Sequence, residues 1–409
     1  MAANPDAIAA YASLLTPAQC GAALVFMPGS GAGLGSAARA HGRFLLDADA
    51  LDGWLLGLLL PGADRFAALA TPNYFLAAHL ARHRPDLGIR YVAALDLTGW
   101  IAAQLPSRHR IGLIGGGEMP AWLLTGLQAA LPQTTLAQAA WLALDTEAHR
   151  LRQAKAPRDL ARHEAAAALC DHLFAAIPAF LVKQPGAPRL QELIRREAYD
   201  QGCNDCRSWI SYGPMGSDAD IMAPDPAQRL DSSTSSVTVG LMLTLDGAFG
   251  HAIRSYSLGP APAALLAAHD ALLAAGDRLF QGLRPAYAGS GNAGSGPNAA
   301  QHIATLGAEA RAELAARGYP QGFAFRLGHA LGYAYEDPPL SALFQQPFDR
   351  TSNHAVAAAP ETLVAPSLFE LHPSLQLPGL GLIAQGDMLL VEPEANRWAL
   401  KTPRAIIPV

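Results

Sequence analysis

The stretch FRLGHALGYAYEDPP, residues 325–339, places His329 among glycines and follows it with Glu336 and Asp337. Glycine is uncommon within a strand unless another backbone or a ligand must approach closely. A histidine in this setting, with two carboxylates shortly after it, is typical of a functional site. A surface hairpin with a chance histidine would give the same pattern, so the rest of the chain has to decide between the two interpretations.

The composition indicates a globular protein with few charges. Its 409 residues are 51% hydrophobic and 15% charged, which suits two or three domains, or two large lobes, with ample core. The formal charge of −5, with no basic block, argues against a nucleic-acid surface. The most apolar stretch, residues 51–61, is too short to span a bilayer, and the N-terminus lacks the basic region of a secretory signal. We therefore expect a cytoplasmic protein that binds neither nucleic acid nor a membrane.

The four cysteines are too few and too scattered for a disulfide framework in a chain of this length. Cys203 and Cys206 have CxxC spacing, but no second pair completes a zinc site. A structural or incidental role is therefore favoured for this pair, and redox or metal chemistry stays open.

The first part of the chain alternates predicted strands with predicted helices. An α/β domain is therefore expected over residues 1–150. The glycine-rich segment 29–42 matches a dinucleotide-binding loop only loosely, and it lacks the acidic residue expected about 20 positions further on. The expected strands are 20–28, 66–71, 89–94 and 110–117, and the expected helices are 74–83, 96–105 and 119–132.

The second part of the chain, residues 151–409, contains the clearest hairpin. In VTVGLMLTLDGAFGHAIRSYSLG, residues 237–259, Asp246-Gly247 forms a two-residue turn between apolar strands. The Gly/Ser/Asn-rich stretch 287–302 is expected to be a flexible loop that could act as a lid. Helices are expected over 145–181 with a break at 156–157, and over 190–203, 260–283 and 302–318; strands are expected at 209–214, 368–373 and 387–393.

The order of these segments resembles the creatinase/prolidase/aminopeptidase P superfamily. The resemblance implies an α/β (α+β) fold, with a creatinase-type N-terminal α/β domain over 1–150 and a pita-bread catalytic-type domain over 151–409. It also implies a homodimer. The stretches that carry it are RLRQAKAPRDL (150–160), RSYSLG (254–259), GHALGYAYEDP (328–338), FELHP (369–373) and GDMLLV (386–391).

Metal-dependent members of this superfamily bind two divalent ions through five side chains. The resemblance places those five positions at Gly240, His251, His329, Glu370 and Gly386. Two ions with a combined charge of +4 need several carboxylates to offset their dehydration, and only Glu370 provides one here. A dinuclear peptidase centre is therefore not expected.

The residues that remain suggest acid–base chemistry. The resemblance brings His251, His329 and Glu370 to one cavity, with Glu336 and Asp337 near its rim. Two imidazoles and a carboxylate can act as general acid and base without a metal ion, and creatinase is the superfamily precedent for this. We therefore expect a metal-independent, creatinase-like enzyme without a cofactor. It would act on a C–N bond of a small amide, guanidino or amino-acid-like molecule.

Four residues are candidates for binding the substrate: Glu336, Asp337, Asp220 and Arg254. Creatine itself is not indicated, because the loop histidine of creatinase has no clear equivalent here and one of its carboxylate positions is Ile253.

Two other interpretations stay open. His251, His329 and Glu370 could hold a single iron or zinc ion, with His372 nearby. Alternatively, the chain could be a pseudoenzyme that kept the fold as a ligand-binding module. Each residue also has a purely structural interpretation; His329, for example, could be a satisfied core histidine.

Overall fold

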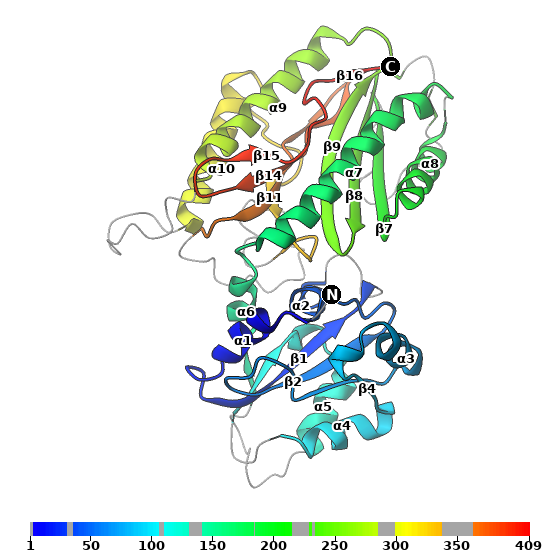
Figure 1. The fold of residues 1–409 in the computed structure, drawn as a ribbon. Helices are drawn as coiled ribbons and strands as arrows, with labels where there is room; N and C mark the ends of the chain where they lie inside the picture. Colours follow the sequence, from blue (N-terminus) through cyan, green and yellow to red (C-terminus); the bar gives the residue numbers. More distant parts are fainter. Residues whose placement is uncertain are drawn as a thin grey trace. The chain divides into compact units, whose positions relative to one another are not determined.

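The computed structural model describes residues 3–30, 36–105, 110–130, 141–183, 185–214, 229–230, 234–284, 299–337 and 363–409. The chain divides into two compact units, coloured along the sequence in Figure 1. The first unit comprises Met1–Arg152 and Tyr333–Pro338, and the second comprises Gln153–Gly332 and Pro339–Val409. The segment that follows His329 therefore packs with the first unit.

The first unit is built on a six-stranded mixed sheet of order β4-β3-β2-β1-β5-β6. Strand β2 is antiparallel to both β1 and β3, and the other neighbouring strands are parallel. The strands are β1 (Cys20–Pro28), β2 (Trp54–Leu59), β3 (Ala68–Thr71), β4 (Arg90–Tyr91), β5 (Arg110–Ile114) and β6 (Trp141–Ala143). The helices are α1 (Pro5–Ser13), α2 (Arg39–Leu46), α3 (Tyr74–His83), α4 (Ala94–Ala102), α5 (Ala121–Ala130) and α6 (Asp145–Leu151), with short 3₁₀ turns η2 (Pro85–Leu87) and η3 (Gly116–Glu118).

The expected strands of this unit are present, although β4 is only two residues long. The structure adds the strands β2 and β6 and the helices α1 and α2, which the sequence patterns did not indicate. Strand β2 lies between β1 and β3 and is buried along most of its length. A strand that is buried on both faces reads as a continuous apolar run, so it shows no alternation of polar and apolar residues.

The second unit contains two four-stranded sheets and a two-stranded sheet. Their orders are β16-β9-β8-β7, β10-β11-β14-β15 and β12-β13. The strands are β7 (Asp205–Gly213), β8 (Ser236–Leu245), β9 (Ala248–Ser257), β10 (Gly328–Ala330), β11 (Ser367–Leu371), β12 (Ser374–Leu377), β13 (Gly381–Ala384), β14 (Asp387–Val391), β15 (Arg397–Trp398) and β16 (Ile407–Pro408). The helices are α7 (Pro157–Leu181), α8 (Ala187–Asp200), α9 (Ala263–Gly282) and α10 (Ala299–Ala316).

The expected hairpin of the second unit is confirmed as β8 and β9. Asp246 and Gly247 have φ of 48° and 78°, the positive values that a type I′ turn requires at both central positions. The turn fixes the register, in which Met242 lies opposite His251 and Gly240 lies opposite Ile253. The hairpin therefore decides which residues of β8 lie beside the histidine.

Helix α7 begins at Pro157, after the break expected at 156–157, and runs along β8 and β9 (Figure 1). Pro157 suits the first helical position because its missing N–H would have no partner there. The helix approaches β9 closely, since a Cβ on Gly250 would lie 2.7 Å from the carbonyl oxygen of Ala166. By length and composition α7 could cross a membrane, which is weak evidence because the core helix of a globular protein passes the same test.

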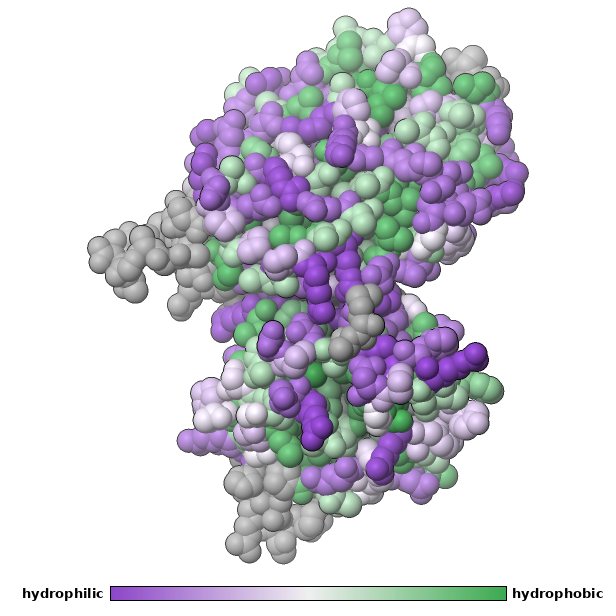
Figure 2. Space-filling model, viewed as in Figure 1, coloured by the Kyte–Doolittle hydropathy of each residue, from purple (hydrophilic) through white to green (hydrophobic). Residues whose placement is uncertain are grey.

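Hydrophobic clusters fill both units. In the first unit they lie on the two faces of the sheet, around β1, and in the second they lie beneath α9 and α10. On the face shown in Figure 2, hydrophilic residues are interspersed with hydrophobic ones over both units.

Candidate functional site

Three strands of the second unit bring the candidate catalytic residues together. His251 lies on β9, His329 on β10 and Glu370 on β11. His329 and Glu370 are directly opposite each other in the antiparallel pair β10–β11. His372 follows Glu370 by two residues, which is the spacing that returns a side chain to the same face of a strand. All four side chains are buried.

We call His251, His329, Glu370 and His372 the His–Glu cluster. One carboxylate oxygen, Oε2 of Glu370, lies 3.4 Å from Nδ1 of His251, 3.9 Å from Nε2 of His329 and 3.3 Å from Nε2 of His372. The rings of His251 and His329 stack with their centroids 5.6 Å apart. Sequence analysis placed His372 only near this set, and its spacing of two from Glu370 was the signal that could have made it a full member.

The backbone fixes the tautomer of His329. Its Nδ1 lies 3.0 Å from the carbonyl oxygen of Ala330, which can only accept, so Nδ1 carries the proton and donates. Nε2 then keeps its lone pair and directs it toward the Glu370 carboxylate. Neither Glu370 oxygen has a hydrogen-bond donor among the described residues. The lone pair of Nε2 and the carboxylate repel each other in a buried site, and a proton or a cation between them would remove that repulsion.

Burial sets the protonation of the His–Glu cluster. It lowers the pKa of His251 to about 3 and holds the pKa of His329 and His372 well below the usual histidine range, and Arg326 adds to each effect. Burial also raises the pKa of Glu370 well above its usual range, with Asp387 as the next cause. The cluster therefore combines three neutral imidazoles with a carboxyl group that readily takes a proton or a cation.

The cluster fits one metal ion. The reactive atoms of His251, His329 and Glu370 all lie within 4.8 Å of one another. Ligands about 2.0–2.2 Å from a tetrahedral ion are about 3.3–3.6 Å from each other. The Glu370 oxygen lies within this range of His251 and His372, and slightly further from His329 at 3.9 Å. Neutral imidazoles and a carboxylate are ligands that zinc and iron accept.

The resemblance places two of the five ligand positions of the superfamily's two-ion centre at Gly240 and Gly386. At both glycines, neighbouring atoms fill the space that a side chain would need. A Cβ on Gly240 would lie 2.0 Å from Nε1 of Trp209. A Cβ on Gly386 would lie 2.7 Å from Cγ1 of Ile253.

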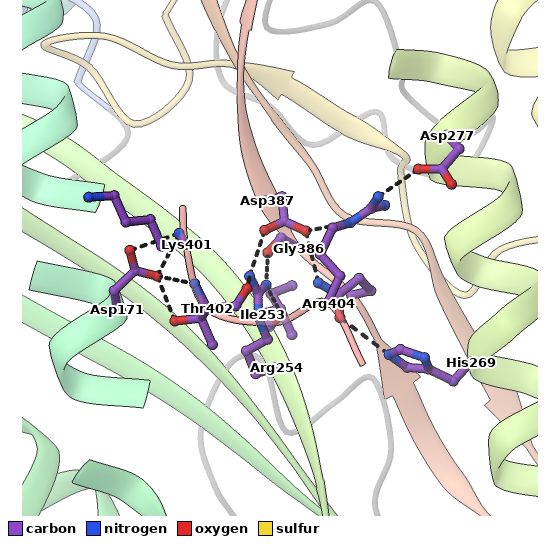
Figure 3. Close-up of polar contacts among 11 residues, drawn as sticks. Asp171, Ile253, Arg254, His269, Asp277, Gly386, Asp387, Lys401, Thr402 and Arg404 are labelled. Atoms are coloured by element: carbon purple, nitrogen blue, oxygen red, sulfur yellow. Dashed lines mark hydrogen bonds and ion pairs between the residues drawn. The ribbon is translucent and has the colours of Figure 1, made fainter. Parts of the chain in front are cut away.

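Arg254 does not have the position expected for a residue that binds substrate. It is completely buried, and its guanidinium group donates to Asp387 at 2.7 Å and to the carbonyl oxygens of Ile253, Gly386 and Thr402 (Figure 3). These bonds tie β9 to β14 and to the C-terminal segment. Because its side chain is completely buried and both terminal nitrogens donate within the fold, Arg254 does not suit the substrate-binding role predicted for it.

The contacts of Asp387 continue beyond Arg254. Its second carboxylate oxygen accepts hydrogen bonds from Gln385 at 2.8 Å and from Arg404 at 3.2 Å, and Arg404 also pairs with Asp277 on α9 (Figure 3). Gln385 lies 3.3 Å from His269 of the same helix. This network anchors the C-terminal segment beside the strands that carry the His–Glu cluster.

Asp337, expected at the rim of the His329 cavity, takes part in an ion pair inside the first unit. It belongs to the first unit, is buried there, and pairs with Arg152 at 3.0 Å. Its carboxylate is therefore held by an internal ion pair rather than offered to a substrate. Glu336 belongs to the same unit, and its substrate role stays a prediction. Asp220 and residues 287–298 of the expected lid lie outside the described residues.

A second polar cluster in the first unit was not found from the sequence. His41, Asp145 and His149 bring potential metal ligands within 4.8 Å of one another. However, Nδ1 of His41 lies 2.8 Å from the guanidinium of Arg152, which can only donate, so the lone pair of that ring is occupied. Asp145 accepts a hydrogen bond from the backbone of the first unit. We call this cluster the His41 network, and we interpret it as a buried hydrogen-bond network that stabilises the first unit and not as a metal site.

The CxxC pair is consistent with a structural role. Cys203 and Cys206 are buried free thiols at the start of β7. The thiol of Cys203 donates to the carbonyl oxygens of Asp205 and Thr244, which joins the turn before β7 to β8.

Comparison with known proteins finds the same group of peptidases by sequence and by structure. The model of metallopeptidase family M24 matches residues 161–393. The probable dipeptidase PepE of Mycobacterium tuberculosis is 25% identical over 369 residues, which cover 87% of this chain and 86% of that protein. The crystal structure of dipeptidase PepE from Mycobacterium ulcerans has a TM-score of 0.71 at 20% identity, covering 100% of this chain and 98% of that one. The prolidase from Pyrococcus horikoshii has a TM-score of 0.74 at 13% identity, covering 98% and 100%. The expected fold class, with a creatinase-type α/β domain and a pita-bread domain, is confirmed.

Proposed function

The chain belongs to metallopeptidase family M24, and from this we propose that it hydrolyses an amide-type C–N bond of a small, peptide-like substrate at a centre that holds one transition-metal ion. The observation that carries the proposal is the meeting of three neutral imidazoles around one oxygen of Glu370, at 3.3 to 3.9 Å. Family membership supports a peptidase-type reaction. The similarity to proteins named dipeptidase and prolidase supports a substrate of dipeptide size.

The ion would be held by His251, His329, His372 and Glu370. When bound, it would polarise the scissile carbonyl group and lower the pKa of a water molecule. The carbonyl oxygen of Ala330 keeps the proton of His329 on Nδ1, so that Nε2 offers its lone pair to the centre. Glu370 supplies the single negative charge, and the burial of all four side chains strengthens each electrostatic interaction by excluding water.

A second candidate is the metal-independent acid–base reaction expected from the sequence. The raised pKa of Glu370 favours it, because a carboxyl group that keeps its proton near neutral pH can donate that proton to a leaving nitrogen. His251, 3.4 Å from the carboxyl group, or His329, whose Nε2 lies 3.9 Å from it, would then accept the proton from the attacking water. This reaction needs no cofactor.

Metal analysis of the purified protein, combined with assays on a panel of dipeptides that includes Xaa-Pro peptides, separates the two candidates. We expect about one equivalent of zinc or iron per chain, a loss of hydrolysis on chelation and its recovery when the ion is returned. Glu370→Gln should lose both the ion and the activity, whereas the surface control Glu313→Gln should keep both. Full activity of the metal-free protein would establish the second candidate instead. Tight binding of a peptide without any turnover would indicate a ligand-binding pseudoenzyme.

We also propose that the protein is a homodimer, as the superfamily resemblance implies. Light scattering coupled to size-exclusion chromatography should give twice the mass of the 42.8 kDa chain. A monomer mass at micromolar concentration would refute this.

A further inference from the structure

We propose that Trp209 takes the place of the second metal ion of the family and thereby limits this centre to one ion. The inference rests on the proposed function, since it assumes that the His–Glu cluster binds the first ion. It concerns residues that the catalytic proposal does not use: Trp209 on β7, Gly240 on β8, and Ile253 and Gly386 beside them.

Gly240 lies between two large side chains on one face of the sheet. In the antiparallel register its neighbours are Trp209 on β7 and Ile253 on β9. Residues directly opposite each other in such a sheet point to the same face. The indole of Trp209 lies across the glycine, so that a Cβ there would be 2.0 Å from Nε1 and 2.1 Å from Cε2. No side chain, and therefore no carboxylate, can stand at position 240 while Trp209 keeps this place.

Neighbouring side chains hold Trp209 in that position. It packs with Ile253, Leu382 and Ala384 in a buried apolar cluster. Its ring also meets Phe325 edge to face, at a centroid distance of 6.4 Å and an interplanar angle of 89°. Phe325 in turn lies 5.3 Å from the ring of His372. The aromatic pair thus connects the filled position directly to the His–Glu cluster.

Gly386 is closed by the backbone as well as by side chains. It forms an isolated bridge with Ile253, with reciprocal N–H···O bonds of 3.0 and 3.1 Å (Figure 3). A Cβ on Gly386 would lie 2.5 Å from Oε1 of Glu370 and 2.8 Å from the backbone nitrogen of Ile253. A carboxylate at position 386 would therefore push β9 away from β14.

The charges around the cluster also disfavour a second dication. The charged groups that act on Glu370 are Asp387, Arg326 and Arg254, one negative and two positive. Asp387 is already paired with Arg254 at 2.7 Å. A second ion would thus enter a buried region without a carboxylate of its own, where an uncompensated charge is unfavourable. Trp209 is uncharged, so it can occupy this buried region without a carboxylate to compensate it.

Zinc titration followed by elemental analysis of the full-length protein tests the inference. The wild-type chain should bind one ion. Two further variants each introduce carboxylates at two of the missing positions through Gly240→Asp and His251→Asp. The first variant keeps Trp209, and the second also carries Trp209→Ala. We expect at most one ion in the first variant and two in the second.

Two ions in the wild-type chain, or in the variant that keeps Trp209, would overturn the inference and leave the proposed function standing. A single ion after removal of Trp209 would also overturn it. A wild-type chain that binds no zinc would remove the one-ion function and this inference together.

Thermal unfolding in the presence of a chelator tests, without any metal ion, whether Trp209 leaves no space for a side chain at position 240. Gly240→Ala should lower the melting temperature by about 5 °C, because it overpacks the space beneath the indole. In the double variant Gly240→Ala/Trp209→Ala the glycine substitution should cost much less. Gly99→Ala is the control, since its Cβ would meet nothing within 4 Å and should not lower the melting temperature. Additive effects of the two substitutions, or a harmless Gly240→Ala, would contradict the inference.

Discussion

Replacing Arg254 by methionine should strongly destabilise the second unit. The guanidinium group is completely buried and donates four hydrogen bonds, to the Asp387 carboxylate and to three carbonyl oxygens, at 2.7 to 3.0 Å. Methionine fills a similar volume but leaves Asp387 buried with a negative charge and the carbonyl groups without this donor. Removing one partner of a buried pair typically costs about 3–5 kcal/mol. Gln385 and Arg404 still contact Asp387, so we expect the lower end, about 3 kcal/mol.

Urea unfolding followed by circular dichroism and tryptophan fluorescence measures this cost. Arg254→Lys should recover little of it, because an ammonium group cannot reach four acceptors arranged around a planar guanidinium. Arg317→Met is the matched control, since Arg317 forms an exposed pair with Glu313 within α10 and should change the free energy of unfolding by at most about 0.5 kcal/mol. A loss below about 1 kcal/mol for Arg254→Met would refute the view that this network holds β9 to β14.

Three further predictions concern the His–Glu cluster, the His41 network and the ion pair between Arg152 and Asp337. His372→Ala should weaken zinc binding at least about 100-fold in a chelator competition, and an unchanged affinity would remove His372 from the centre. Burial and Arg152 hold the pKa of His41 well below its unfolded value, so only the unfolded chain takes up that proton as the pH falls below about 6.5. His41→Gln should therefore reduce the acid-induced loss of stability by about 1.4 kcal/mol per pH unit below 6.5; equal slopes of unfolding free energy against pH for both proteins would contradict this. Asp337→Asn should cost about 3 kcal/mol in the same unfolding assay, and Arg152→Met/Asp337→Leu should regain most of it; a double variant as unstable as the sum of its parts would contradict the pairing.

Much of the second unit could be predicted from local signals. Asp246-Gly247 between two apolar strands indicated the hairpin, and Pro157 indicated where α7 begins. In the first unit β2 was missed, because a strand buried on both faces carries no alternation that marks it as a strand. The helix α2 was missed because it follows a glycine-rich segment that reads as a loop.

The candidate site was predictable only where residue type and motif spacing were sufficient. His329 and Glu370 meet because antiparallel pairing sets them directly opposite each other. The assignment of Arg254 failed because its partners, Asp387 and Thr402, lie more than a hundred residues away in the chain. The ion pair of Asp337 could not be predicted for the same reason, since its partner Arg152 lies 185 residues earlier.

The sequence by itself determined that positions 240, 251 and 386 carry no carboxylate, and the superfamily resemblance turned this into the expectation that a two-ion centre is absent. It also determined the local elements, because turns and helix starts depend on the backbone preferences of a few adjacent residues. Only the tertiary structure decided what replaces the missing groups. That Trp209 fills the space above Gly240, and that His372 joins the cluster, follows from strand register and side-chain packing. Such contacts join segments whose separation in the chain carries no information about their distance in space.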